Sequence, residues 1–293
     1  MDGRRTAIIG VANGYGAGNR ACQDGPEFLK SFNVLSDIED TQHLLCWDEL
    51  IGDNTPYLGR INAIENIATL LAERIAQHLW NGDSPLVIGG DHSCAIGTWS
   101  GVKRYLGEEE RLGLIWIDAH MDSHTFNTSP SHNIHGMPLA CLLGYGESQL
   151  TKIATDYPKL LPQDVCLIGI RSYESGEAAL LKELGVRIYF MDEVRQRGII
   201  TIFAEAHRHV CANTAGYGIS LDLDVLDPSD APGVGTPIPG GLKHEDVIDA
   251  LLLAHGDEKL LALEIVEYNP YLDKNFVTAR AIHDFCQSLI LRR

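Results

Sequence analysis

A six-residue apolar run, Leu112 to Ile117, constrains the fold of this chain more than any other segment. The run shows no alternation of apolar and polar residues, so a strand formed by it must be buried on both faces. Such strands are typical of parallel sheets that are covered by helices on both sides. The run ends in Asp118-Ala119-His120-Met121-Asp122, which places three potential metal ligands at the end of a buried strand. Buried carboxylates need a partner, and a divalent cation satisfies several at once.

Similar apolar runs alternate with helix-period segments along the whole chain. Strands are expected over 6–11, 43–47, 85–88, 112–117, 165–170, 187–191, 218–223 and 260–266. Helices are expected over 25–32, 60–80, 93–105, 136–143, 177–184, 199–211, 243–253 and 275–292, where apolar residues recur at helical spacing. This alternation predicts an α/β fold of three layers, with a mainly parallel sheet of about eight strands between two layers of helices. No linker, repeat or low-complexity segment interrupts it, which favours one domain over residues 1–293.

Candidate metal ligands follow three of these strands. Gly89-Gly90-Asp91-His92 follows one strand, Asp118 to Asp122 follows another, and Asp222-Leu223-Asp224 follows a third. Sites in open parallel sheets form beyond the carboxyl ends of strands, so these side chains are expected to converge. Each motif is weak by itself, but the three together in one α/β chain are a strong signal. The six candidate ligands are His92, Asp118, His120, Asp122, Asp222 and Asp224.

The types of these six side chains indicate the kind of ion. Four carboxylates and two imidazoles without a thiolate suit Mn²⁺, Mg²⁺, Fe²⁺ or Co²⁺ better than a structural zinc ion. Because carboxylates can bridge, six residues suffice for two metals. Two ions about 3.5–4 Å apart can hold a water between them and lower its pKa from about 15.7 toward 7. The sequence therefore predicts a centre that supplies hydroxide at neutral pH.

Charge and cysteine usage argue against several classes of protein. The formal net charge of −17 argues against nucleic acid or an anionic membrane as a partner. No segment approaches the roughly 18 apolar residues of a membrane span, and the first residues lack the pattern of a signal peptide. The spacing of Gly14, Gly16 and Gly18 does not match a dinucleotide-binding fingerprint. The seven cysteines are widely spaced and form no C-x-x-C pair, which indicates reduced thiols in a cytoplasmic protein.

Six motifs, ordered along most of the chain, resemble the ureohydrolase family and, within it, the arginases. They are GGDHS (89–93), DAHMD (118–122), NIHG (133–136), SLDLDVLDP (220–228), GTPIPGG (235–241) and EIVEYNP (264–270). The resemblance implies an arginase-like fold, two Mn²⁺ ions per subunit, and hydrolysis of the guanidinium of L-arginine to L-ornithine and urea. It also implies a homo-oligomer, either a trimer or a hexamer.

The resemblance assigns four protein ligands to each ion, with two carboxylates shared. One ion would be held by His92, Asp118, Asp122 and Asp222. The other would be held by His120, Asp118, Asp222 and Asp224. Asp118 and Asp222 would then bridge the two ions.

Three residues match the family's catalytic positions. Asp122 would accept a hydrogen bond from the metal-bridging hydroxide and steady the tetrahedral intermediate. His135 matches the proton-shuttle histidine, and the ordinary histidine pKa near 6.5 suits that work. Glu267 matches the glutamate that pairs with the N–H donors of the guanidinium.

The loop over 123–135 is expected to select the substrate, because long loops without structure of their own are usually functional. Its pattern resembles the arginases, in which hydroxyl and amide groups of this loop bind the α-carboxylate of the substrate. It does not resemble the agmatinases, whose substrate has no α-carboxylate. Two positions depart from the family. His124 stands where arginases usually carry an asparagine that touches the carboxylate, and Glu174 stands where an aspartate helps to bind the α-amino group. The implied substrate-binding residues are His124, Ser129, Ser131, Asn133, Glu174 and Thr236.

Two other functions stay open from the sequence. The chain could be another guanidino- or amidino-hydrolase, acting on agmatine, a guanidino acid or formiminoglutamate. It could also be a non-catalytic, metal-binding regulatory protein, although retention of every ligand together with His135 and Glu267 argues against that. The identity of the metal is open as well, since Mn, Co, Fe and Ni all tolerate this ligand set.

Overall fold

The structure, a computed structural model, describes residues 5–38, 45–52 and 59–290. Its centre is an eight-stranded sheet in which every neighbouring pair of strands is parallel, in the order β2-β1-β3-β8-β7-β4-β5-β6. The strands are β1 (Thr6–Ala12), β2 (Leu45–Gly52), β3 (Ser84–Gly89), β4 (Leu112–Ile117), β5 (Val165–Ile170), β6 (Arg187–Phe190), β7 (Gly216–Asp222) and β8 (Leu260–Val266). The predicted parallel sheet is therefore confirmed.

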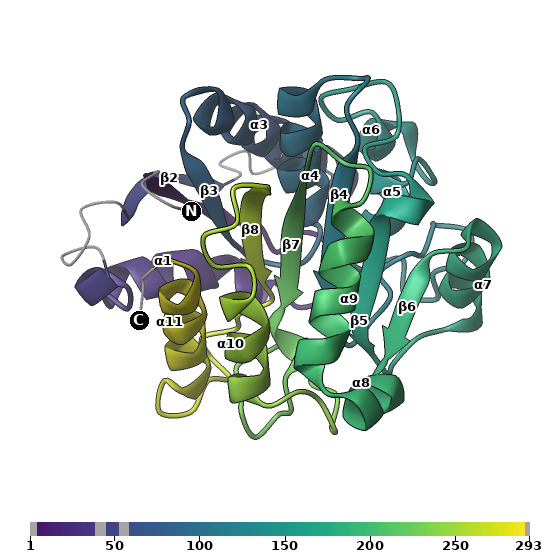
Figure 1. The fold of residues 1–293 in the computed structure, drawn as a ribbon. Coiled ribbons are helices and arrows are strands. Elements are labelled where there is room, and N and C mark those ends of the chain that lie inside the picture. The colour runs from purple at the N-terminus through teal and green to yellow at the C-terminus, as the bar shows by residue number, and fades with distance from the viewer. Residues whose placement is uncertain (1–4, 39–44, 53–58, 291–293) are drawn as a thin grey trace.

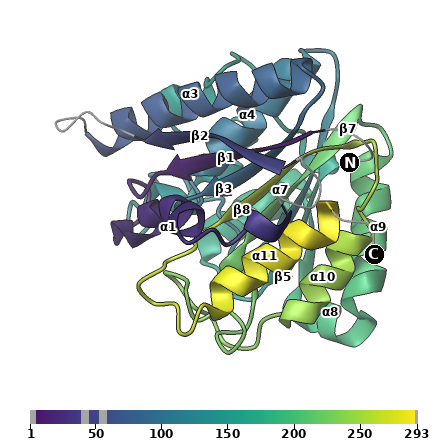
Figure 2. The same ribbon diagram turned by 90° about the vertical axis from the view of Figure 1, so that its left-hand side faces the viewer.

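Helices cover both faces of this sheet (Figure 1). Figure 2 shows the sheet between a layer that contains α3 and α4 and a layer that contains α10 and α11. The first layer is formed by α3 (Arg60–Trp80), α4 (Cys94–Leu106), α5 (Pro138–Leu142) and α7 (Ser175–Leu184). The second is formed by α1 (Gly25–Ser31), α8 (Met191–Arg197), α9 (Ile199–Cys211), α10 (His244–Leu252) and α11 (Val277–Ile290). The predicted three-layer α/β architecture is confirmed.

The pleat of β4 divides its side chains between the two helical layers. Ile115 and Ile117 belong to the apolar core on the side of α9, α10 and α11. Leu114 and Trp116 belong to the core on the side of α3 and α4. All four side chains are buried. A strand covered on both faces has no polar side, which explains the lack of alternation in its sequence.

Four segments differ clearly from the prediction. Strand β2 ends at Gly52 rather than 47, and residues 43 and 44 of the expected strand lie outside the described residues. In place of one helix over 136–143 there is a 3₁₀ turn followed by α5, because Pro138 lacks an N–H and favours the first position of a helix. Helices α8 and the four-residue α6 (Ser148–Thr151) were not predicted. Helix α8 buries only Met191 and Val194, too few apolar residues to show a helical period.

The four strands that carry the candidate site lie next to one another. Strands β3, β8, β7 and β4 form the middle of the sheet, although they are the third, eighth, seventh and fourth strands of the chain. Because all four strands are parallel, the segments that follow them meet at the carboxyl ends of the strands. Open parallel sheets bind their ligands at these ends.

Two further observations concern the whole described chain. Among the described residues, no helix is both long enough and apolar enough to cross a membrane. Six cysteine side chains are described and all carry free thiols: Cys22, Cys94, Cys141, Cys166, Cys211 and Cys286.

Candidate metal centre and active site

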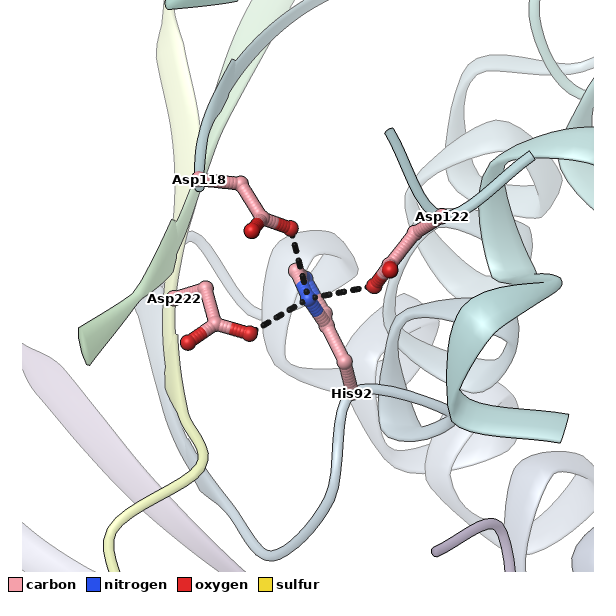
Figure 3. A group of neighbouring side chains, drawn as sticks. All are labelled: His92, Asp118, Asp122 and Asp222. Carbon is pink, nitrogen blue, oxygen red and sulfur yellow. Dashed lines mark ion pairs between the residues drawn. The ribbon is translucent and has the colours of Figure 1, made fainter. Parts of the chain in front are cut away.

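The first group of side chains surrounds one imidazole nitrogen. Nδ1 of His92 lies 3.3 Å from a carboxylate oxygen of Asp118, and 3.0 Å from one of Asp122 and one of Asp222. Figure 3 shows the three carboxylates pointing at this nitrogen from different directions. All four residues are buried. Three anionic groups converging on one buried nitrogen need a positive charge at their centre.

Hydrogen bonds behind His92 identify the nitrogen that carries the proton. Nε2 of His92 lies 3.0 Å from Oγ of Ser220, and that hydroxyl donates to Oε2 of Glu264 at 2.9 Å. Because Ser220 gives its only proton to the glutamate, its oxygen accepts from Nε2–H of His92. Nδ1 is the nitrogen that faces the carboxylates, and a bound cation there would take its lone pair. Among the described residues it has no hydrogen-bond partner.

This arrangement fits a metal ion. A lone pair and three carboxylate oxygens repel one another unless a cation lies between them. Two ligand atoms about 2.1 Å from one ion, at right angles, are about 3.0 Å apart. The distances of 3.0–3.3 Å around Nδ1 of His92 agree with that spacing. The buried His/Asp group therefore has the donors and the geometry of a metal-binding site.

A second group shares one carboxylate with the first. Nδ1 of His120 lies 3.0 Å from Oδ2 of Asp224 and 3.6 Å from Oδ1 of Asp118, while the other oxygen of Asp118 faces His92. Asp118 thus contributes one oxygen to each group, as a bridging ligand would. Asp222 contributes an oxygen only to the first group, and its Oδ1 accepts the backbone N–H of Asp224 at 2.8 Å. The six predicted ligands are brought together in two adjoining groups.

Two residues of the site have an unusual backbone. Asp122 has a φ of +47° and Glu267 a φ of +69°, and neither is a glycine or an asparagine. Residues with side chains seldom adopt this left-handed conformation, and where they do it is often at functional sites. The carboxylate of Asp122 points toward His92 (Figure 3).

His135 and Glu267 are paired, although 132 positions separate them. Nδ1 of His135 lies 3.0 Å from Oε1 of Glu267, which also accepts the backbone N–H of His92 at 2.9 Å. Burial lowers the pKa of His135, but the contact with Glu267 outweighs it and raises the pKa to about 9. Sγ of Cys22 donates to Oε2 of Glu267 at 3.3 Å, and burial raises the pKa of that thiol, which keeps its proton. Glu267 is buried behind His135 and does not line the cavity described below.

The glycine-rich loop after β1 supports this part of the site. The backbone N–H of Gly16 donates to Asp91 at 2.7 Å, and its carbonyl accepts the N–H of His135 at 3.2 Å. A side chain at Gly16 would meet Asp91, Ser93 and His135 within 3 Å. The loop thus needs glycine for close packing against His135, rather than for binding a dinucleotide.

A cavity extends from the metal-binding groups to the 123–135 loop. All six predicted substrate-binding positions line it: His124, Ser129, Ser131, Asn133, Glu174 and Thr236. The hydroxyls of Ser129 and Ser131 accept backbone N–H groups of the loop and so shape it. Thr236 donates to Asp224 at 2.8 Å, which connects the GTPIPGG segment to the second metal-binding group.

Sequence reasoning missed several residues of this site. Glu177 lines the cavity, is buried, and has a pKa raised by burial to about 8. Ser220 and Glu264 lie behind His92, and Asp91 and Cys22 lie behind His135 and Glu267. Asp91, Ser220 and Glu264 belong to the quoted motifs, but only their contacts reveal what they do. Glu177 and Cys22 lie in no quoted motif and gave no signal.

Comparison with known proteins identifies the family. A family model described as "Arginase family" matches residues 4–291. The arginase of Bacillus caldovelox is 41% identical over 282 residues, which cover 93% of each chain. This chain belongs to the arginase family. Membership identifies it as a hydrolase that acts on the carbon–nitrogen bonds of guanidino groups.

Solved structures of arginase-family proteins agree over nearly the whole chain. The Bacillus caldovelox arginase superposes with a TM-score of 0.92 at 38% identity, covering 99% of each chain. The Entamoeba histolytica arginase, solved in complex with L-ornithine, has a TM-score of 0.90 at 31% identity, again with 99% of each chain covered. The predicted membership and the arginase-like fold are both confirmed.

Proposed function

We propose that this enzyme hydrolyses L-arginine to L-ornithine and urea at two Mn²⁺ ions. The observation that carries the proposal is the cavity, which joins the two metal-binding groups to a loop bearing Ser129, Ser131 and Asn133. A guanidinium at the metal end would place an α-carboxylate near these hydroxyl and amide groups. The Entamoeba relative that was solved with L-ornithine supports the choice of an amino-acid substrate.

The donor set supports manganese. Carboxylates and imidazoles without a thiolate suit Mn²⁺ better than softer or strictly tetrahedral ions. When bound, two such ions lower the pKa of a water between them toward 7 and so supply hydroxide at neutral pH. The residues that would hold them are His92, Asp118, His120, Asp122, Asp222 and Asp224.

The protein's own groups would then orient and protonate the reactants. Asp122 accepts a hydrogen bond from the attacking water and directs it toward the guanidinium carbon. Glu267 is expected to pair with the guanidinium, although it does not line the cavity. Oε1 already accepts two N–H groups, so the guanidinium would have to reach past His135 and take the place of the Cys22 thiol at Oε2. His135, whose pKa is raised to about 9, holds a proton at neutral pH. With Nδ1 engaged by Glu267, Nε2 of His135 is the atom that would protonate the leaving amine.

A substrate panel tests this proposal. Urea release is measured from L-arginine, agmatine and guanidinobutyrate, with added Mn²⁺ and after chelation. We expect L-arginine to give the highest kcat/KM and chelation to abolish turnover until Mn²⁺ is restored. A preference for agmatine would show that the loop does not bind an α-carboxylate. Absence of urea from every compound would rule out hydrolysis of these three guanidino compounds.

A further inference from the structure

The imidazole of His124 links two segments that line the cavity, the 123–135 loop and the start of α7. Its Nε2 lies 2.9 Å from Oε2 of Glu174, and its Nδ1 lies 3.0 Å from the hydroxyl of Thr128. His124 belongs to the 123–135 loop, and Glu174 immediately precedes α7. We infer that His124 and Glu174 act as one unit that sets the affinity for the amino-acid end of the substrate. This inference rests on the proposed arginine hydrolysis and deepens it.

Both nitrogens of His124 are used inside the protein. The hydroxyl of Thr128 also accepts the backbone N–H of Thr125 at 3.0 Å, so it is part of the turn that begins the loop. His124 is buried, and its own backbone N–H donates to the carbonyl of Gly136 at 2.9 Å. The ring therefore has no free nitrogen for a substrate carboxylate. Its effect on the substrate passes through Glu174.

Glu174 depends on this contact for its position. About 60% of its side chain is exposed, and an exposed glutamate otherwise samples several rotamers. The contact with His124 holds the carboxylate over the cavity and is the main cause that lowers the pKa of Glu174, which stays ionised. Glu177, the buried carboxylate below it, lies 3.7 Å from the same His124 nitrogen. The acidic side of the cavity therefore has one buried carboxylate, Glu177, and one exposed carboxylate, Glu174, and His124 contacts both.

The loop and the start of α7 are packed against each other at the same place. A side chain at Gly176 would lie 2.7 Å from Cβ of Thr128, so the two segments touch directly. The backbone N–H of Ser123 donates to Glu177 at 3.4 Å. These contacts place the acidic side of the cavity at a fixed spacing from the hydroxyl and amide groups of Ser131 and Asn133. An α-amino acid carries its ammonium and carboxylate on one carbon, so it binds well only when that spacing is correct.

Two substitutions at His124 separate its contact with Glu174 from its bulk. In His124→Gln, the side-chain amide can occupy the place of Nε2 and still donate to Glu174, whereas His124→Ala removes the donor. We expect His124→Ala to raise KM for L-arginine about tenfold, as loss of a hydrogen bond to a charged group would. His124→Gln should stay within about threefold of the wild-type KM. In both, kcat should change less than about twofold, because metal-binding residues and His135 are untouched.

A double-mutant cycle tests whether the pair acts as one unit. Glu174→Gln keeps an acceptor for His124 but removes the charge that would attract an α-ammonium, so KM should rise. The double variant His124→Ala/Glu174→Gln should show a KM close to that of Glu174→Gln alone, because His124 acts through Glu174. Multiplied single effects would instead show that His124 contributes by another route, and would overturn the inference.

Inhibition constants locate the effect within the cavity. L-Ornithine carries the amino-acid end, whereas guanidinium ion carries only the reacting group. His124→Ala should raise the inhibition constant of L-ornithine and leave that of guanidinium unchanged. His132→Asn, an exposed change in the same loop that tolerates the positive φ of this position, is the matched control and should alter neither constant.

The outcomes distinguish this inference from the proposed function. If the wild-type enzyme releases no urea from L-arginine, the proposed substrate is wrong and the role given to the pair fails with it. If the wild type hydrolyses L-arginine but His124→Ala keeps its KM, only the role of the pair is overturned. An equal rise in KM for His124→Ala and His124→Gln would also overturn it, since the retained donor would then have no effect.

Discussion

Ser220 donates a hydrogen bond to Glu264 in the interior of the sheet, with 2.9 Å between Oγ and Oε2. Neither residue lines the cavity, yet the pair places a proton on Nε2 of His92, the nitrogen opposite the one that faces the three carboxylates. A carboxylate buried between the sheet and α4 is costly unless it is hydrogen-bonded. Glu264 accepts from both Ser220 and Thr98, and so holds the first metal-binding group in one protonation pattern.

Ser220→Ala should therefore weaken metal binding by about 10- to 100-fold, as loss of a partner behind a metal ligand usually does. The measurement is a titration of the metal-free protein with Mn²⁺ by calorimetry. Ser100→Ala is the matched control, because Ser100 is also buried but its hydroxyl has no hydrogen-bond partner among the described residues. Equal affinities in the two variants would contradict the role of Ser220.

Asp118 offers one oxygen to each metal-binding group, so Asp118→Ala should lose both ions. Asp222→Ala should do the same if Asp222 also bridges, as the family resemblance implies. The metal content after gel filtration, measured by elemental analysis, decides both cases. One ion retained in Asp222→Ala would show that Asp222 serves the first group alone, which is the group it contacts in this structure. Full occupancy in Asp118→Ala would exclude a bridging role for that residue.

His135→Asn should lower kcat by a factor of about 10² to 10⁴, the range typical of general acid–base groups. The asparagine amide can take the place of Nδ1 and still donate to Glu267, but it has no proton to give to the leaving amine. Metal content and KM should change little. Steady-state kinetics at saturating Mn²⁺ measures the effect, and a rate within twofold of wild type would remove the proton-transfer role.

Glu177 should make the stability of the metal-free protein depend on pH. Burial raises the pKa of Glu177 to about 8 in the folded chain, above the roughly 4.5 of an unfolded chain. The folded state therefore binds more protons between those values, and the stability gained from protonation is lost as pH rises toward 8. Glu177→Gln should match the wild type at pH 5 and melt at least about 3 °C higher at pH 8.

The measurement is a thermal melt in chelator at both pH values. Glu183→Gln, an exposed change on the same helix, serves as the control and should not alter the pH dependence. A variant Glu177→Gln that melts with the wild type at pH 8 would show that this carboxyl does not titrate in that window.

Much of the fold followed from local patterns. An apolar run without alternation, such as Leu112–Ile117, predicts a strand buried on both faces wherever it lies in the sheet. Short helices with few apolar residues escaped prediction, because α8 buries only two side chains and a period needs more. Strand order was out of reach, since nothing local to β8 says that it lies between β3 and β7.

The sequence by itself determined the chemistry at the strand ends. His92, Asp118 and Asp222 follow apolar runs, and a carboxyl end of a parallel strand is a functional position whatever its neighbours are. The tertiary structure decided which of these groups meet and how each is held. His135 reaches Glu267 across 132 positions, and His124 reaches Glu174 across 50. Such pairs depend on how the strands are ordered and how the loops pack, and no short segment of sequence encodes either one.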